Sequence, residues 1–170
     1  MEDKLVNRIA ESGLITLDLA NYKPGQAVVA FDLAPFLFMG QVLREKAFRD
    51  DIAQQDWESY RGKYVAVFCS TDAIIPSWAF MLVASQLEGI AVDIHAGTPE
   101  QVYQQLFTSR MRQELKGENF ANQRVILKGC GDATVGPFAY LEATQILKPH
   151  VKTLMYGEPC STVPVYKRKD

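Results

Sequence analysis

From residue 64 onward the chain alternates short apolar runs with longer segments of helical character. Apolar runs of strand length occur at 64–68, 90–94, 125–127 and 153–156. Segments of helical length lie between them, at 73–87, 99–111 and 137–147. Continuously apolar strands separated by helices are typical of a parallel sheet that helices cover. The alternation therefore predicts a three-layer α/β fold with a mainly parallel central sheet, for which we expect a flavodoxin-like strand order.

The first 62 residues show a different pattern of apolar segments, which predicts an N-terminal α+β extension. We expect a helix at 4–11, strands at 14–19, 28–31 and 36–43, and an amphipathic helix at 46–55. Gly40 lies inside the third strand, where it indicates a bulge or a close approach of another backbone. Because no linker rich in Pro, Ser or Gly separates the two halves, we expect one domain over 1–170, with a βα core at 63–170.

Composition excludes several classes of protein. The 170 residues include 18 basic and 20 acidic side chains, a formal net charge of −2, and 48% of them are hydrophobic. This balance does not fit a disordered chain, and it gives no electrostatic basis for nucleic-acid binding. The most apolar segment, 73–87, is shorter than the roughly 20 residues that cross a bilayer. We therefore expect a cytoplasmic protein with neither a nucleic-acid nor a membrane partner.

Two segments of the chain resemble each other. Residues 69–80 can be laid against residues 130–140 with one gap after the leading cysteine, which aligns an Asp-Ala pair and later aromatic residues. Each copy reads as a strand, a cysteine, an acidic turn and a helix that begins near proline. The end of the chain repeats the Cys-Ser-Thr of residues 69–71 at 160–162. Similar turn chemistry explains part of this likeness, but it does not explain the common position of the cysteines.

The three cysteines, Cys69, Cys130 and Cys160, each follow an expected strand. The carboxyl ends of parallel strands share one edge, where open α/β sheets bind their ligands. Three thiolates there would suit zinc in a site with an open fourth position, or an iron–sulfur cluster. His95 or Asp72 would supply a further ligand. The cysteines therefore predict a metal- or iron–sulfur-binding protein, although their spacing matches no compact metal motif.

Two other interpretations stay open. A thiol-dependent enzyme acting on a small molecule could use Cys69 or Cys160 as nucleophile and His95 as base. Free cysteines are also among the most frequently buried residues, so the chain could be a scaffold or interaction protein in which they only pack. The sequence contains neither the phosphate-binding loop nor the dinucleotide-binding glycine motif.

Several motifs carry a resemblance to known sequences. They are residues 42–46, residues 69–76 with Trp78-Ala79, residues 128–130, and above all YGEPCSTVP at 156–164 followed by Tyr166-Lys167. With these motifs the chain resembles an uncharacterised bacterial family that is known only as a domain of unknown function. The resemblance implies a small cytoplasmic α/β protein with no assigned activity and no catalytic residues to carry over. It also implies genes near those for iron–sulfur assembly, which favours a cluster or metal role with iron–sulfur assembly proteins as partners.

Overall fold

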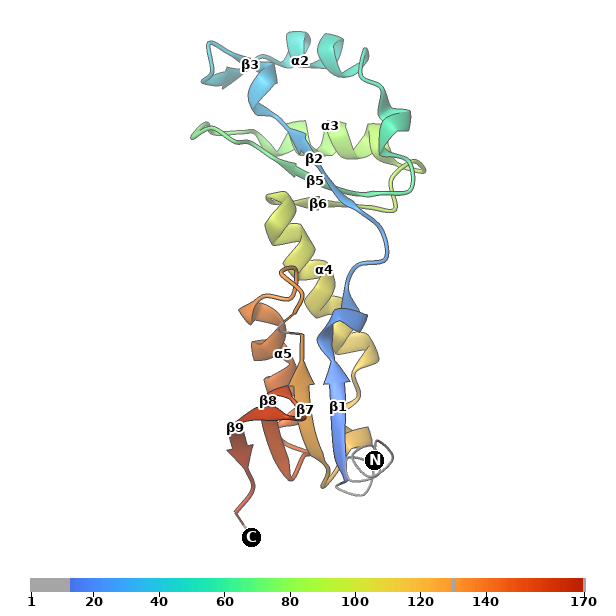
Figure 1. The fold of residues 1–170 in the computed structure, drawn as a ribbon. Helices are drawn as coiled ribbons and strands as arrows, with labels where there is room; N and C mark the ends of the chain where they lie inside the picture. Colours follow the sequence, from blue (N-terminus) through green and yellow to red (C-terminus); the bar gives the residue numbers. More distant parts are fainter. Residues whose placement is uncertain (1–12, 130, 170) are drawn as a thin grey trace. The chain divides into compact units, whose positions relative to one another are not determined.

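The computed structural model describes residues 13–129 and 131–169, and the chain divides into two compact units (Figure 1). Unit 1 comprises Met1–Lys23 and Gln104–Asp170, and unit 2 comprises Pro24–Tyr103. The chain therefore begins in unit 1, builds the whole of unit 2 and then returns to unit 1. This division differs from the expected boundary at residue 62, and the organisation of the chain as one domain stays a prediction.

Unit 2 is built around a three-stranded parallel sheet. Its strands are β2 (Val28–Asp32), β5 (Tyr64–Phe68) and β6 (Asp93–Ala96), in the order β2-β5-β6. Its helical elements are η2 (Ala34–Phe36), α2 (Glu45–Ile52), η3 (Trp57–Tyr60), α3 (Ser77–Leu87) and the start of α4 (Pro99–Glu114). A hairpin of β3 (Leu37–Phe38) and β4 (Val42–Leu43) follows η2.

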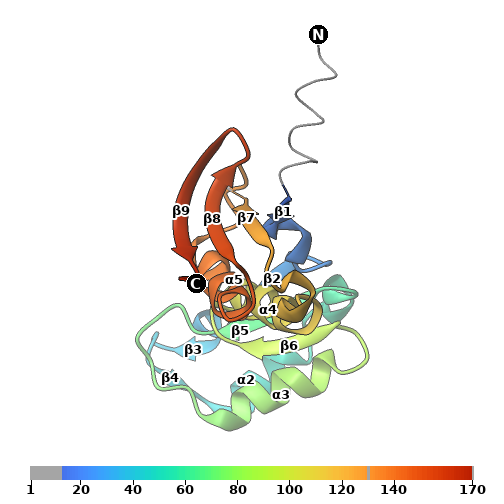
Figure 2. The same ribbon diagram turned by 90° about the horizontal axis from the view of Figure 1, so that it is seen from below.

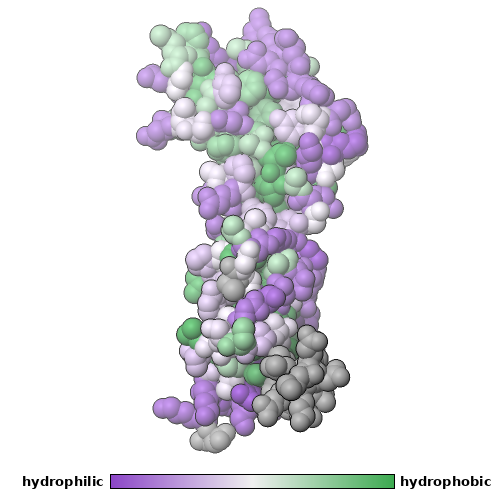
Figure 3. Space-filling model, viewed as in Figure 1, coloured by the Kyte–Doolittle hydropathy of each residue, from purple (hydrophilic) through white to green (hydrophobic). Residues whose placement is uncertain are grey.

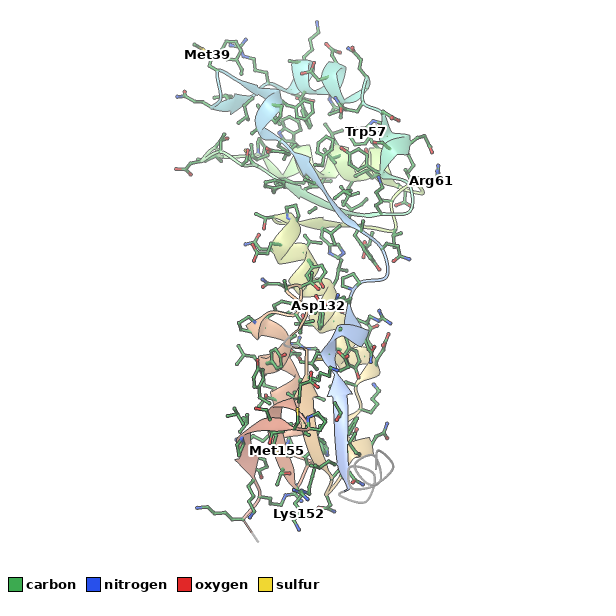
Figure 4. All side chains as sticks on the ribbon, in the orientation of Figure 1. Met39, Trp57, Arg61, Asp132, Lys152 and Met155 are labelled. Atoms are coloured by element: carbon green, nitrogen blue, oxygen red, sulfur yellow. The ribbon has the colours of Figure 1, made fainter. Side chains whose placement is uncertain are left out.

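Aromatic side chains fill much of the core of unit 2. Phe31 on β2 stacks with Phe36 and Trp57, at ring-centroid distances of 5.6 and 5.2 Å. The indole N–H of Trp57, labelled in Figure 4, donates to the carbonyl of Ile52 over 2.9 Å. Because the polar atom of Trp57 is satisfied, the ring can be buried at little cost. These contacts fix α2 and η3 against β2.

Unit 1 is built around a four-stranded sheet. Its strands are β1 (Leu14–Asp18), β7 (Arg124–Lys128), β8 (Thr153–Glu158) and β9 (Ser161–Lys167), in the order β1-β7-β8-β9. The first three strands run parallel, and β9 returns antiparallel to β8. Its helical elements are η1 (Leu19–Tyr22), the end of α4, η4 (Gly117–Phe120) and α5 (Pro137–Leu147).

Helices α4 and α5 lie side by side on one face of this sheet (Figure 2). The guanidinium of Arg112 on α4 donates two hydrogen bonds to the carboxylate of Glu142 on α5, over 2.6 and 2.8 Å. The Glu142 side chain is buried, and such a bidentate pair combines charge attraction with a fixed geometry. Phe107 and Phe138 meet edge to face beside this pair. The two helices are therefore tied together at both polar and aromatic contacts.

The prediction of an α/β chain with a mainly parallel sheet is confirmed, and the architecture is consistent with three layers. The strands divide between two sheets, however, so the flavodoxin-like order expected for one sheet is not found. The reason is that the two N-terminal strands join different sheets. Strand β1 pairs with β7 and β2 pairs with β5, so that each completes a separate sheet.

Several expected elements differ in detail from the structure. The strand expected at 36–43 is a hairpin, because Met39 and Gly40 take the positive φ values (52° and 70°) of a tight turn. The helix expected from residue 73 begins after Pro76, since the residue before a proline avoids helical conformation. The strand expected at 90–94 lies at Asp93–Ala96. The helix expected at 4–11 falls outside the described residues.

Thr98 caps the N-terminus of α4. The backbone N–H of Gln101 donates to the Thr98 hydroxyl over 3.3 Å, and the Thr98 N–H donates to the Gln101 side chain over 2.9 Å. This reciprocal pair is a capping box. It satisfies two N–H groups that the first turn of the helix would otherwise leave without partners.

The two units repeat one order of elements with one strand register. In unit 2 Tyr64 pairs with Asp93, and in unit 1 Arg124 pairs with Thr153, an offset of 60 residues on both strands. The same offset relates the bounds of η3 to those of η4 and the bounds of α3 to those of α5. Segments 57–97 and 117–157 are therefore an ungapped repeat.

Backbone details confirm this correspondence. Gly62 and Asn122, which are 60 residues apart, both take a positive φ, 71° and 60°. Each donates its N–H to a carbonyl that is itself equivalent, that of Ile90 in unit 2 and that of His150 in unit 1. The two units thus repeat the backbone conformation of individual residues as well as the order of helices and strands.

The first strand of each unit belongs to the repeat as well. Strand β1 ends at Asp18 and β2 ends at Asp32, and each carboxylate accepts a hydrogen bond of 2.9 Å from the N–H two residues later. Both contacts start a 3-10 helix, η1 or η2. Unit 2 thus follows η1 of unit 1 in the chain and ends within α4.

The constant offset corrects the alignment of the two cysteine segments. No gap is needed, because Asp72 corresponds to Asp132 at an offset of 60. Cys69 then corresponds to Gly129 and not to Cys130. The cysteines do not occupy equivalent positions in the repeat, so their apparent common place in the unit disappears.

Gly157→Ala is expected to lower the free energy of unfolding by about 3 kcal/mol or more, because a positive φ and a backbone clash act together. Gly157 has φ of 117°, and an added Cβ would overlap the carbonyl oxygen of Ser161 in the β8–β9 hairpin. Gly62→Ala is the matched control, since Gly62 has φ of 71° and open space around it. It should cost about 1 kcal/mol. Urea denaturation of both variants checks this, and equal losses would contradict it.

Candidate functional site

A cavity of about 770 Å³ lies in unit 1 between α5 and the β8–β9 side of the sheet. Its floor contains Leu127, Tyr156 and Val163, which are paired with one another across β7, β8 and β9. One face of α5 forms a wall, with lining residues at helical spacing: Pro137, Tyr140, Leu141 and Thr144. The other lining residues are Asp132, Ala133, Val135 and Val165. We call this the unit 1 cavity.

Apolar side chains remain exposed around the unit 1 cavity. Leu141 is 65% exposed and Val163 is 59% exposed, and Tyr156 and Val165 are exposed as well. On the face drawn in Figure 3, hydrophobic residues are scattered among neutral and hydrophilic ones. Isolated apolar residues are normal at protein surfaces, whereas apolar groups gathered around a hollow mark a place of binding.

The unit 1 cavity lies where α/β sheets usually bind ligands. Leu127 and Tyr156 are near the carboxyl ends of the parallel strands β7 and β8, and α5 begins at Pro137 beside them. In open α/β sheets ligands bind in the crevice outside the carboxyl ends of the strands. Both the position in the fold and the chemistry of the lining therefore favour a binding site.

Two tyrosines are fixed in the wall and the floor of the cavity. The rings of Tyr140 and Tyr156 meet edge to face, with centroids 5.2 Å apart. Gly129 (φ 154°) lies behind Tyr140, and a Cβ at this position would be only 3.0 Å from the Tyr140 hydroxyl and from Val135. A larger residue than glycine would therefore displace the Tyr140 side chain.

Asp132 (labelled in Figure 4) places a carboxylate at the cavity. It forms an ion pair with Lys23, and it accepts hydrogen bonds from the N–H of Thr134 (2.9 Å) and from the Thr134 hydroxyl (2.6 Å). The hydrogen bond from Lys23, followed by those from Thr134, lowers the pKa of Asp132 to about 2. Asp132 is therefore a fixed anion at neutral pH and is already engaged by its neighbours.

The structure separates the predicted metal ligands. Cys69 follows β5 in the sheet of unit 2, and its Sγ lies 3.2 Å from the Thr71 hydroxyl. Cys160 is exposed in the turn between β8 and β9, in the sheet of unit 1. Cys130 lies outside the described residues. The shared edge on which the prediction depended does not exist, because the cysteine-bearing strands belong to two sheets.

The prediction of a metal- or iron–sulfur-binding protein is wrong. Within residues 13–129 and 131–169, no group of three or more His, Cys, Asp or Glu side chains is placed to hold a metal ion. Asp72 is exposed in the loop before α3. His95 Nε2 lies 3.2 Å from the carboxylate of Asp93, an ion-pair distance without hydrogen-bond geometry, and not beside a thiol.

Residues 3–168 match the family that is described as "Protein of unknown function (DUF2480)". The chain belongs to this family. The expected resemblance to an uncharacterised family is thereby confirmed, while iron–sulfur assembly proteins as partners stay a prediction. No curated protein and no solved structure matches the chain. No helix in the described part of the chain is both long enough and apolar enough to cross a bilayer.

Sequence reasoning missed the unit 1 cavity although two of its signals were present. Val163 and Val165 are apolar residues at alternate positions, a pattern typical of a half-buried strand. Pro164 between them, however, argues against a strand. The cavity-lining face of α5 is visible as apolar or aromatic residues at 137, 140 and 141. The residues of β9 and α5 line one cavity because of the β8–β9 hairpin, which periodicity alone does not reveal.

Asp132→Asn is expected to lower the urea midpoint at neutral pH and to have a much smaller effect near pH 2. The folded-state pKa of Asp132 is about 2, below the ordinary value of an aspartate, so the ionised carboxylate stabilises the fold above the unfolded-state pKa. This contribution is lost as the pH falls from about 4 towards 2. Denaturation of both proteins between pH 7 and pH 2 checks this. A difference that does not change with pH would contradict it.

Proposed function

We propose that the chain binds a small, largely apolar molecule in the unit 1 cavity. The observation that carries the proposal is the cavity of about 770 Å³, formed by aromatic and aliphatic side chains at the carboxyl ends of β7 and β8. Ligand sites in proteins typically measure about 300–1,000 Å³ and are mainly apolar with a few polar groups. A ligand there would remove exposed apolar surface from water, at roughly 25 cal/mol per Å².

The lining favours an aromatic or branched aliphatic ligand body. Tyr140 and Tyr156 present ring edges and faces that suit offset or edge-to-face contact. Thr144 is not a free donor, because its hydroxyl donates to the carbonyl of Tyr140 over 2.7 Å. The Asp132–Lys23 pair offers polar contact to one end of the ligand without net charge.

The lining favours binding over chemistry. Among the described residues that form the cavity, Asp132 is the one charged group, and its low pKa makes it a poor general base at neutral pH. The carboxylate is also held by Lys23 and Thr134. The arrangement is that of a receptor or carrier for a small molecule.

Val163→Trp is expected to weaken the binding of N-phenyl-1-naphthylamine, a neutral aromatic probe that fluoresces in apolar sites. The indole would fill the floor of the cavity, so that the apparent affinity should fall at least about tenfold, equivalent to roughly 1.4 kcal/mol. Fluorescence titration of the wild-type chain and the variant measures this. Near-ultraviolet circular dichroism checks that the variant keeps its fold.

Ile74→Trp is the matched control for this experiment. It adds the same indole at a residue that is 94% exposed in unit 2, outside the cavity, and it should leave the affinity unchanged. Absence of saturable binding to the wild-type chain would overturn the proposed function. Equal binding by wild type and Val163→Trp would overturn the assignment to this cavity.

A further inference from the structure

Unit 2 contains a smaller counterpart of the unit 1 cavity. A cavity of about 230 Å³ lies between α3 and the β5–β6 side of the sheet, which we call the unit 2 cavity. Five of its lining residues precede a lining residue of the unit 1 cavity by 60 positions: Val67, Phe80, Met81, Ala84 and Ala96 precede Leu127, Tyr140, Leu141, Thr144 and Tyr156. The two cavities are therefore one groove of the repeat, found in both units.

The groove differs between the units because only unit 1 has a strand in the place of β9. Strand β9 pairs antiparallel along β8, and its residues Val163 and Val165 complete the groove. In the described part of unit 2 the sheet ends at β6, whose one strand partner is β5. An edge strand offers N–H and C=O groups to a further strand. On β6 such a strand would replace the hydrogen bond of 2.8 Å that the Ile94 N–H donates to the Asp93 carboxylate. Met81 beside this edge is 71% exposed.

Charge on β6 complements the strand that unit 1 uses. In unit 1, Thr153 on β8 faces Lys167 on β9. The equivalent of Thr153 is Asp93 on β6, whose side chain is 61% exposed. Its carboxylate accepts a hydrogen bond from the N–H of Ile94 and lies 3.2 Å from His95 Nε2. A β9-like strand on β6 would place a basic residue opposite the Asp93 carboxylate. Opposite charges at directly facing positions of antiparallel strands stabilise the pair.

The size of the side chains that line the groove indicates which residue a strand added to β6 would carry. Tyr156, which faces Val163 across β8 and β9, corresponds to Ala96 in unit 2, and Tyr140 corresponds to Phe80. The unit 2 groove thus lacks an aromatic ring where unit 1 has one. A segment seated on β6 can therefore place a side chain larger than valine at the position of Val163 and fill the groove.

We propose that β6 takes up an extended segment of a partner protein as an additional antiparallel strand. The segment has alternating apolar side chains, with a large one over Ala96 and a lysine or arginine facing Asp93. Backbone hydrogen bonds along the edge supply affinity, and the groove and the carboxylate supply specificity, as in other cases of β-strand addition. This site is separate from the unit 1 cavity and does not depend on the proposed ligand.

Two fluorescein-labelled peptides test the proposal on the full chain. The first has the sequence of residues 161–168, STVPVYKR, and the second has Phe in place of its first Val, the equivalent of Val163. We expect saturable binding of both by fluorescence anisotropy, several-fold tighter for the Phe peptide. Hydrogen exchange should show new amide protection at residues 93–96 of the chain.

A charge exchange tests the contact at Asp93. Asp93→Lys should weaken binding of the Phe peptide about fivefold, and a peptide with Glu in place of Lys should restore it on this variant. The Glu peptide should in turn bind the wild-type chain about fivefold more weakly, a readout that does not depend on the folding of any variant. Asp50→Lys, the same charge change on the exposed surface of α2, is the matched control and should leave the affinity unchanged.

Three results would overturn the proposal. The first is no saturable binding of either peptide to the wild-type chain. The second is amide protection in β8 instead of β6, which would mean that the peptide replaces β9 in unit 1. The third is a concentration-dependent dimer in light scattering with residues 93–96 protected in the absence of peptide, which would assign the edge to a second copy of the chain.

Discussion

The pairing of β1 with β7 is the interaction on which unit 1 depends. It joins Leu14 to Arg124, which lies 110 residues further along the chain, and the whole of unit 2 is formed in between. Closing a long loop costs only slightly more entropy than closing a shorter one, but contacts of such separation form slowly. The same pairing brings Lys23, which follows η1, to Asp132, which follows β7. The fixed anion at the unit 1 cavity is therefore a consequence of this long-range register.

The local elements were predictable because burial imposes a pattern on the sequence. The apolar run at 64–68 and the helix at 137–147 are found where periodicity and helix-start signals place them. Strand partners were not predictable in the same way, since an apolar run does not say which sheet it joins. A signal for the two sheets was nevertheless present, because Asp-Leu-Ala follows both N-terminal strands, at 18–20 and 32–34.

The candidate site was missed for a related physical reason. The cysteine hypothesis assumed one sheet edge, and it failed because Cys69 and Cys160 follow strands of different sheets. The unit 1 cavity instead depends on β9. This strand was hard to predict because it contains Pro164, and proline cannot donate a hydrogen bond to a neighbouring strand. Its lining residues are also partly exposed, so that they lack the continuous apolar pattern of buried strands. Sites that bind ligands leave weaker sequence periodicity than cores do.

The differences between the units fall on the grooves, while the positions that shape the backbone are shared. Asp18 and Asp32 start equivalent 3-10 helices, and Gly97, directly after β6, and Gly157, near the end of β8, both have positive φ. Within the groove, by contrast, Ala96 in unit 2 stands where unit 1 has a tyrosine, and β6 lacks a counterpart of β9 among the described residues. A scaffold that is held constant while its groove varies indicates different binding tasks for the two units. A groove completed by its own strand would suit the small molecule proposed for unit 1, and a groove beside an edge strand would suit the segment proposed for unit 2.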